Sequence, residues 1–283
     1  MLRTLRHYAN GLRSDRQALP QVLLIGAQKA ATSSLYQYLA THTQICQGKK
    51  EIDFFTVNYE KGKSFYKRQF PVSNKITIDA SPRYIYDAEV PARVARMMPS
   101  TTKIIVSLRD PVKRAFSAWN MYKQICQRPE IVERFKQAEA KNEEFKLYSE
   151  YCKGYFPSFQ NCVKREMDWI ESGDFIVEPS LVRRGFYVEQ IERWLQFFPK
   201  ENFFFVNSQD LSNEVSAKEI LHELEGFIGI KQGELMNLDF GHHHKRKYES
   251  PISEDLVNEL KMLYQERNQG LEDLTDLKFS WLK

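Results

Sequence analysis

Residues 21–40 read QVLLIGAQKAATSSLYQYLA, and this stretch decides the fold. Its opening run, 21–25, is short and apolar and ends at Gly26, which is typical of a strand buried on both faces of a parallel sheet. After the loop GAQKAAT, the segment SSLYQYLA at 33–40 places apolar side chains on one face of a helix. The stretch therefore predicts a buried strand, a tight loop and a helix in direct succession.

The loop between this strand and this helix has the features of a phosphate-binding site. Free N–H groups at a helix N-terminus point at one spot, and the helix dipole favours an anion there. A lysine adds positive charge, two alanines let the backbone approach a phosphate, and three hydroxyls can donate. The predicted phosphate ligands are Lys29, Ala30, Ala31, Thr32, Ser33 and Ser34. A simpler interpretation is that Thr32 and Ser33 only cap the helix.

The rest of the chain repeats the alternation of strands and helices. Further strand-like runs lie at 75–79 (KITID), 103–108 (KIIVSL) and 202–206 (NFFFV). Helix-like segments lie at 89–98, 111–124, 185–198, 217–228 and 253–269. This order predicts an α/β fold with a central parallel sheet flanked by helices. Without an internal repeat or a Pro/Gly-rich linker, we expect a single domain over 1–283, with 1–19 as an N-terminal extension.

The composition is that of an ordinary globular protein, with 42% hydrophobic and 28% charged residues. A net charge of +4 and a pI near 8.7 suit an anionic ligand but are too weak to indicate nucleic acid. No apolar run reaches the roughly 18 residues of a transmembrane helix. The N-terminus also lacks the continuous apolar core of a signal peptide. We therefore expect a cytoplasmic protein, although a lumenal domain whose anchor had been removed would look the same.

The cysteines and histidines indicate no metal site. Cys46, Cys126, Cys152 and Cys162 show no CxxC or Cys/His spacing for zinc. The segment CKGYFPSFQNC leaves two interpretations open, a local disulfide between Cys152 and Cys162 or reduced thiols throughout. The adjacent histidines at 242–244 cannot all face one ion in regular secondary structure, so we predict that no metal is bound.

Two motifs resemble the cofactor-binding motifs of sulfotransferases that use PAPS (3'-phosphoadenosine 5'-phosphosulfate). GAQKAATSSLYQYL resembles the family's 5'-phosphosulfate loop, G-x-x-K-S/G/A-G/A-T-S/T, and it lacks the G-K-S/T end of a Walker A loop. KIIVSLRDPVKRAFSAW resembles the 3'-phosphate motif, which here supplies Arg109 and Ser117. A guanidinium at the end of a strand can hold a phosphate through two parallel hydrogen bonds. The alternatives are a local ion pair between Arg109 and Asp110, or a Walker B strand.

A third segment, KKEIDFF at 49–55, resembles the K-E-x-x-F-F segment of glycan O-sulfotransferases, especially the heparan sulfate glucosaminyl 3-O group. The resemblance implies that Glu51 is the general base that deprotonates the acceptor hydroxyl. It also implies that Lys50, with Lys29, lies near the transferred group. The competing interpretation is a solvated charge cluster ahead of two core phenylalanines.

Further matches extend the resemblance over most of the chain. DASPRY at 79–84 occupies the place of the family's T-P-x-Y turn, and 183–199 resembles its G-x-Y…W-L-x-x-F helix. HHHKRKYESPIS resembles the basic loop that closes over the cofactor. The resemblance therefore implies further phosphate contacts by Lys245, Arg246 and Lys247. The segment 128–184 matches least, and we expect it to be an insertion that shapes the acceptor pocket.

Taken together, the resemblance implies a P-loop-like sulfotransferase fold and in-line transfer of the sulfuryl group from PAPS to an acceptor hydroxyl, with PAP as product and no metal. The expected acceptor is a carbohydrate hydroxyl or a polar small molecule. The alternative to a cytoplasmic location is the Golgi lumen, for a soluble catalytic domain whose anchor has been removed. The alternative function is that of a cytosolic enzyme that tailors a secondary metabolite or toxin by O- or N-sulfation. Two other classes compete with both: a P-loop kinase that uses ATP, and a non-catalytic module that binds a polyanion with strong salt dependence.

Overall fold

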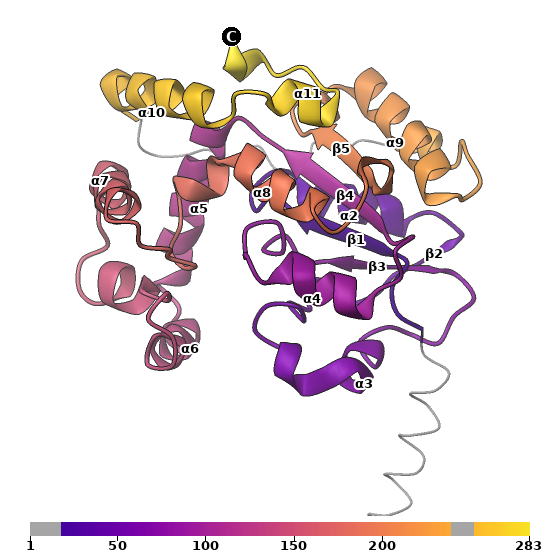
Figure 1. Cartoon of the computed structure of the whole chain (residues 1–283), viewed down its shortest axis with the longest axis horizontal. Helices are drawn as coiled ribbons and strands as arrows, with labels where there is room; N and C mark the ends of the chain where they lie inside the picture. The colour runs from indigo at the N-terminus through magenta and orange to yellow at the C-terminus, as the bar shows by residue number, and fades with distance from the viewer. Residues whose placement is uncertain (1–17, 239–251) are drawn as a thin grey trace, which may run out of the picture. The chain divides into compact units, whose positions relative to one another are not determined.

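The computed structural model describes residues 18–238 and 252–283. These residues form two compact units, one from 18–108 and 190–238 and the other from 109–189 and 252–283 (Figure 1). The expectation of one domain over the whole chain stays a prediction. No helix in the described ranges combines the length and the apolar character that a bilayer crossing requires.

The first unit is built on a five-stranded sheet in the order β2-β3-β1-β4-β5, and every neighbouring pair is parallel. Its strands are β1 (Val22–Gly26), β2 (Ile45–Cys46), β3 (Ile76–Ala80), β4 (Lys103–Leu108) and β5 (Phe203–Asn207). The α/β fold with a central parallel sheet flanked by helices is therefore confirmed. The sequence missed only β2 among these strands, because two residues are too few to show a pattern.

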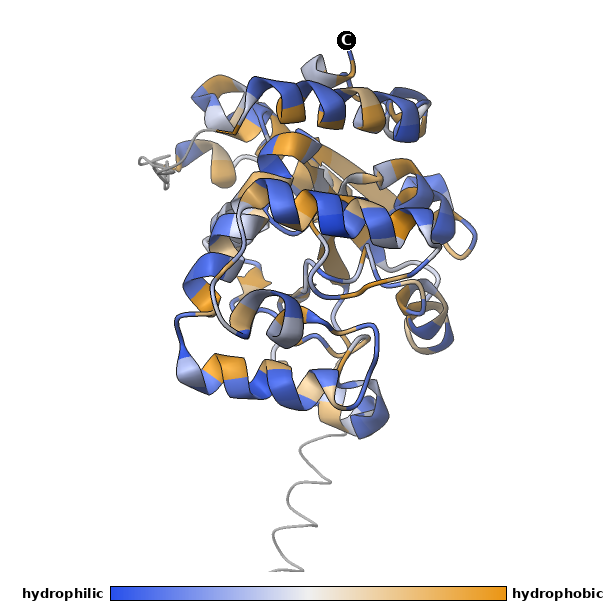
Figure 2. Cartoon of the chain, turned by 90° about the vertical axis from the view of Figure 1, so that its left-hand side faces the viewer, coloured by the Kyte–Doolittle hydropathy of each residue, from blue (hydrophilic) through white to orange (hydrophobic). Residues whose placement is uncertain are grey.

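Helices complete the first unit, and some of them bury apolar side chains against the sheet. They are α2 (Thr32–Ala40), α3 (Gly62–Lys67), α4 (Val90–Met97) and α9 (Glu214–Ile228), and α8 (Tyr187–Leu195) contributes its C-terminal part. Leu35 of α2 and Leu221 of α9 share one core with Leu24 of β1 and Ile105 of β4. The orange and blue stripes of the helices in Figure 2 show the same amphipathic pattern. This packing fixes where β1 ends, and with it the loop that follows.

The second unit is helical and packs around aromatic side chains. Its helices are α5 (Pro111–Ile125), α6 (Pro129–Glu139), α7 (Phe159–Glu171), α10 (Glu254–Arg267) and α11 (Leu271–Thr275). Shorter helical turns in the two units span Tyr59–Lys61, Tyr148–Cys152, Arg183–Gly185, Lys200–Asn202, Asp210–Ser212, Leu235–Asn237 and Ser280–Leu282. Phe116 and Trp119 of α5 stack on each other with ring centroids 5.6 Å apart, and Phe159 of α7 meets Phe116 edge-on. The core of this unit therefore depends on α5 and α7.

One disulfide corrects the sequence analysis. Cys152 pairs with Cys126 at the end of α5, with a Cα–Cα distance of 5.1 Å, and not with Cys162. Cys162 is a free thiol that is 2% exposed in the core, and burial raises its pKa to about 12. The local pairing was wrong because closeness in sequence does not place Cys162 beside Cys152. Edge-on packing of the Tyr122 and Tyr151 rings brings the end of α5 to Cys152 instead.

Candidate active site

The loop after β1 is tied to β4 at both of its ends. The Ala27 N–H donates to the Ser107 carbonyl oxygen at 2.6 Å, and Ser107 Oγ donates to the Ala30 carbonyl oxygen at 2.6 Å. Ala27 and Ala30 are buried, whereas Lys29 between them is half-buried. The small residues of the loop therefore make its floor, and Lys29 is the charged side chain that the loop presents.

Gly26 fits where no other residue would. A Cβ on Gly26 would lie 2.4 Å from Ile85 Cγ2 and 3.1 Å from the Pro82 carbonyl oxygen. The turn that contains Pro82 thus packs directly on the beginning of the loop. Further along the loop, Lys29 and Ala31 have left-handed φ angles of 71° and 58°. Backbone turns of this kind form the concavities in which proteins bind anions.

The N-terminus of α2 carries no side-chain cap. Ala31 is the N-cap residue and makes no side-chain hydrogen bond, and the Leu35 N–H to the Ala31 carbonyl is the first helical bond, at 3.0 Å. The interpretation of Thr32 and Ser33 as capping residues is therefore wrong, since both lie inside the helix. Uncapped N–H groups at a helix N-terminus are free to bind a phosphate or sulfate group.

Lys50 joins the second motif to this loop. Its Nζ donates to Ser33 Oγ at 2.5 Å and lies 3.7 Å from Glu51 Oε1. Burial lowers the pKa of Lys50, and the charge of Glu51 opposes that effect. The Lys50 side chain is only 24% exposed, which a solvated charge cluster would not show. The structure therefore brings the segment 49–55 into contact with the start of α2, which follows the loop after β1.

Glu51 lies on a turn held firmly at the end of β3. Its backbone N–H donates to the carbonyl oxygen of Ala80 at 3.0 Å, and its side chain is 61% exposed. Behind it, Phe54 and Phe55 are fully buried, and the Phe54 ring stacks on Tyr66 with centroids 4.3 Å apart. Since β1 and β3 are adjacent and parallel, Glu51 and the loop after β1 lie at the same carboxyl edge of the sheet, where α/β proteins bind ligands.

Sequence reasoning missed the polar groups that support this turn. Asp79 is a fully buried carboxylate in β3, and Ser81 and Tyr84 follow it in the DASPRY turn. The hydroxyls of Ser81 and Tyr84 donate to Asp79 and accept from backbone N–H groups of the Glu51 turn. The sequence does contain a sign of this network, which is the aspartate at the end of a strand predicted to be buried. A buried carboxylate needs several hydrogen-bond donors around it.

The second unit contains the other predicted cofactor residues. Arg109 follows the last residue of β4 and is half-buried, and Ser117 on α5 is buried. The carboxylate of Asp110 caps α5 by accepting from the N–H groups of Val112 and Lys113. The backbone carbonyl of Arg109 accepts from Tyr187 OH at 2.7 Å. A 3'-phosphate site at Arg109 and Ser117 stays a prediction.

The three basic residues of the predicted closing loop, Lys245, Arg246 and Lys247, and the histidines 242–244 lie outside the described residues. Within 18–238 and 252–283, no group of three or more His, Cys, Asp or Glu side chains could hold a metal ion.

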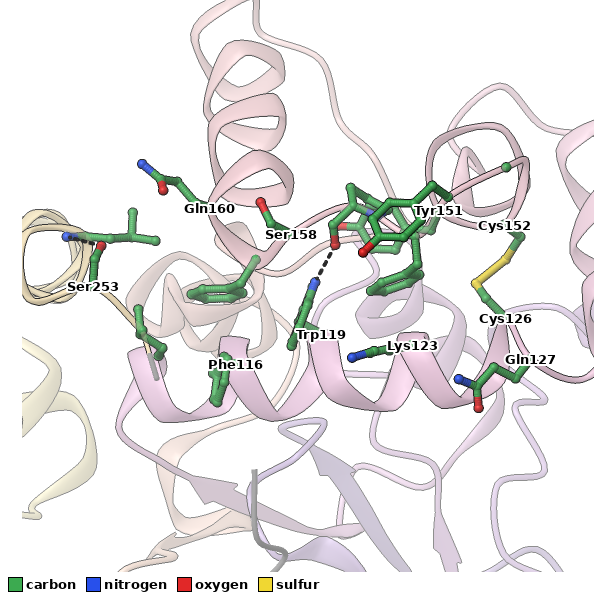
Figure 3. Close-up of a pocket in the computed structure, with 17 residues that line it drawn as sticks. Phe116, Trp119, Lys123, Cys126, Gln127, Tyr151, Cys152, Ser158, Gln160 and Ser253 are labelled. Carbon is green, nitrogen blue, oxygen red and sulfur yellow. Dashed lines mark hydrogen bonds between the residues drawn. A yellow bond between two sulfur atoms is a disulfide. The ribbon is translucent and has the colours of Figure 1, made fainter. Parts of the chain in front are cut away.

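A pocket of about 670 Å³ opens in the second unit (Figure 3). Trp119 and Lys123 of α5 contribute to its wall, with Lys123 Nζ 5.5 Å from the Trp119 ring centroid. Trp119 Nε1 donates to the Pro157 carbonyl at 3.1 Å. The Cys126–Cys152 disulfide lies at one end of the pocket. Residues 151–160, inside the predicted insertion, supply much of the lining.

Comparisons with known proteins agree with these motifs. A family model described as "Sulfotransferase domain" matches residues 19–271. Heparan sulfate glucosamine 3-O-sulfotransferase 3B1 of Mus musculus is 28% identical over 216 residues, which are 76% of this chain and 47% of that protein. Heparan sulfate glucosamine 3-O-sulfotransferase 5 of Homo sapiens is 30% identical over 218 residues, 76% of this chain and 54% of that protein. The chain thus spans about half the length of these relatives.

One solved structure has a similar fold. A sulfotransferase from Alicyclobacillus acidocaldarius has a TM-score of 0.65 and 21% sequence identity, and the match covers 94% of this chain and all of that one. At this identity the likeness concerns the fold alone.

Proposed function

The chain belongs to the sulfotransferase domain family, and on that premise we propose that it transfers the sulfuryl group of PAPS to a hydroxyl of an acceptor molecule. The observation that carries the proposal is the contact of Lys50 with Ser33. This contact sets the segment of the proposed base directly against an uncapped helix N-terminus. A donor bound at that helix would have its transferable group beside Glu51.

The residues of the loop fit a phosphosulfate group. The uncapped N–H groups of α2 supply donors, the buried alanines leave the backbone accessible, and Lys29 supplies charge. The proposed ligands of the 5'-phosphosulfate are Lys29, Ala30, Ala31, Thr32, Ser33 and Ser34. We assign the 3'-phosphate to Arg109 and Ser117, and further phosphate contacts to Lys245, Arg246 and Lys247, on the family resemblance alone.

The proposed mechanism is an in-line displacement at sulfur. The Glu51 carboxylate accepts the proton of the acceptor hydroxyl as the acceptor oxygen bonds to sulfur. The bond between sulfur and the bridging phosphate oxygen then breaks, and PAP leaves with the electron pair. Lys50 and Lys29 offset the negative charge that develops on the leaving group, as cations do in phosphoryl transfer. No step in this scheme requires a metal.

The first candidate acceptor is a glycan, because the curated relatives are named for heparan sulfate. The pocket of the second unit supports a second candidate, a small ring-bearing molecule. Lys123 is the one charged residue among the described residues that line it, and most of the others are aromatic or apolar. Pockets of about 300–1,000 Å³ with such linings bind small molecules, whereas a long polyanion is bound by many cations.

A thermal-shift titration with PAP, with ATP plus magnesium as the control, tests the donor. A ligand that binds the native state raises its melting temperature by mass action. We expect a saturable shift with PAP and little with ATP. A shift in melting temperature with ATP alone would favour the kinase. Nucleotide binding that does not saturate and that is lost as the salt concentration rises would favour the polyanion-binding module.

The acceptor is tested by following PAP release from PAPS with two probes, a heparan sulfate oligosaccharide and 6-hydroxy-2-naphthoate. Turnover with the oligosaccharide supports the glycan, and turnover with the naphthoate supports the small-molecule alternative. The Lys123→Gln variant should have a higher KM for the naphthoate only if the pocket binds this compound.

A further inference from the structure

We propose that Asp79 is a positioning residue, whose buried carboxylate orients the hydroxyls of Ser81 and Tyr84 so that they hold the turn carrying Glu51. The inference rests on the role proposed for Glu51. Asp79 itself is 0% exposed, so its carboxylate is closed off from any bound sulfuryl donor or acceptor molecule.

The Asp79 carboxylate is the centre of a closed hydrogen-bond network. Oδ2 accepts from Tyr66 OH at 2.7 Å and from Tyr84 OH at 2.8 Å, and Oδ1 accepts from Ser81 Oγ at 2.7 Å. These hydroxyls come from α3 and from the turn after β3, and all of their residues are fully buried. An ionised carboxylate only accepts, so it fixes the direction in which each hydroxyl points its hydrogen.

Two of these hydroxyls pass that orientation on to the Glu51 turn. Ser81 Oγ accepts from the Asp53 N–H at 3.1 Å, and Tyr84 OH accepts from the Phe54 N–H at 2.8 Å. A hydroxyl has one hydrogen and two lone pairs. Because the hydrogens of Ser81 and Tyr84 are directed at Asp79, their lone pairs are available to the turn. Tyr66 donates to the same carboxylate but has no such bond to the turn among the described contacts.

The turn needs this support because its backbone is strained. Glu51 and Asp53 have left-handed φ angles of 55° and 49°, a region that residues other than glycine seldom adopt. Such conformations persist only where the surroundings over-determine them. The Glu51 N–H bond to Ala80 anchors one side of the turn, and the two hydroxyls below Asp53 and Phe54 anchor the other.

The network also predicts opposite pH responses of stability and activity. Burial raises the pKa of Asp79 to about 6, and the charge of Asp53 adds to this, while the three hydroxyls lower it. Burial raises the pKa of Tyr66 and Tyr84 far above neutral, so both remain donors. As pH falls through about 6, Asp79 takes up a proton in the folded state before it would do so in the unfolded state. Its contribution to the free energy of unfolding therefore increases as pH falls. The protonated carboxyl is itself a donor, so a hydroxyl must turn away and the Glu51 turn loosens.

The test compares Asp79→Asn, Ser81→Ala and Tyr84→Phe with Tyr66→Phe as the matched control. The control removes one hydrogen bond to Asp79 and leaves the turn's own bonds in place. The first readout is amide hydrogen exchange at Asp53 and Phe54, which needs no acceptor. We expect faster exchange at both amides in Asp79→Asn, at Asp53 in Ser81→Ala and at Phe54 in Tyr84→Phe, and wild-type exchange in the control.

The second readout is kinetic, with whichever acceptor probe is turned over. We expect Asp79→Asn to lower kcat by about 10- to 100-fold, the scale of a misplaced catalytic group, with PAP affinity within about twofold of wild type. The part of the decline in kcat that is centred near pH 6 should be absent from Asp79→Asn and present in Tyr66→Phe. Wild-type exchange at Asp53 and Phe54 together with wild-type kcat in Asp79→Asn would overturn the inference.

If Asp79→Asn fails to fold, Ser81→Ala and Tyr84→Phe decide the same question. A wild-type protein that does not bind PAP, or a Glu51→Gln variant with full turnover, would overturn the proposed function instead. The exchange data would still report whether Asp79 holds the turn.

Discussion

At the scale of single residues, Lys50 connects the two parts of the candidate active site. Its ammonium group contacts a hydroxyl in the first turn of α2 and lies beside the Glu51 carboxylate. Lys49, one position earlier, is exposed and makes no such contact among the described residues. Two adjacent lysines in one motif therefore have different surroundings, and only one of them belongs to the site.

Glu51→Gln tests the proposed base. The amide keeps the size of the side chain but cannot accept the acceptor's proton, so turnover should fall by about 10²- to 10⁴-fold, the usual contribution of a general base. PAP affinity, measured by thermal shift, should stay unchanged. Glu60→Gln is the control, because Glu60 is an exposed carboxylate in the neighbouring helical turn. Full turnover in Glu51→Gln would exclude Glu51 as the base.

Lys50→Met tests the link between the two motifs. The change removes a charged donor to Ser33 while it keeps the apolar stem. Lys50 is proposed to face the leaving phosphate, and loss of a charged hydrogen bond to it, about 1.5–3 kcal/mol, should make PAP bind about 10-fold or more weakly. Isothermal titration with PAP measures this, with Lys49→Met as the matched control. Equal affinities of the two variants would show that Lys50 has no role in donor binding.

At the scale of elements, the site is assembled where strands end. The loop after β1 is bonded to β4 through Ser107, and the Glu51 turn is bonded to the end of β3. Each connection runs from a loop to the strand beside it in the sheet. The order of the strands thus sets the distance between the proposed phosphate site and the proposed base.

Gly26→Ala should damage this assembly without touching a polar group. The added methyl would meet Ile85 Cγ2 at 2.4 Å. Overpacking of this kind costs about 1–3 kcal/mol, which corresponds to a fall of about 2–4 °C in Tm for each kcal/mol in a chain of this size. PAP affinity should fall as well, because the displaced loop carries the phosphate ligands. In the control Gly48→Ala, a Cβ has its nearest neighbour at 4.0 Å. A Gly26→Ala variant with wild-type Tm and PAP affinity would contradict this account of the loop.

At the scale of the whole molecule, a buried carboxylate and a disulfide tie together separate segments of the second unit. Glu166, 3% exposed, accepts hydrogen bonds from Ser180 Oγ and from the N–H groups of Leu181, Val182 and Arg183. The Cys126–Cys152 disulfide closes a loop over a separation of 26 residues. The disulfide joins two residues that line the pocket, and Glu166 fixes the segment 180–183.

Removal of that disulfide should destabilise the protein. Loop-entropy estimates for a loop of this length give about 3 kcal/mol, so Cys126→Ser or a reductant should lower Tm by several degrees. The control Cys46→Ser removes a free, half-buried thiol and should have little effect. Thiol titration of the denatured, unreduced protein should find only Cys46 and Cys162. Titration of all the cysteines without reductant, or a Tm insensitive to reductant, would show that the bond does not form.

The sequence by itself determined the parallel α/β sheet and placed the proposed phosphate loop between a strand and a helix. Apolar runs specify buried strands locally, and the loop residues owe their chemistry to a helix start that immediately follows a strand. The boundaries of β1, β3, β4 and β5 were predicted to within a residue or so for the same reason. The roles of Arg109, Ser117 and the basic loop at 245–247 also came from the sequence, and they stay predictions.

Only the tertiary structure decided which side chains meet. The Lys50–Ser33 contact joins residues 17 positions apart, and the Ser81 and Tyr84 hydroxyls reach amides 28 and 30 positions away. The disulfide likewise joins Cys152 to Cys126 and not to Cys162, which is nearer to Cys152 in the sequence. A local pattern cannot predict such pairs, because each depends on how the sheet order and the core packing bring separate segments together. The support of the Glu51 turn by Asp79 follows from that packing alone.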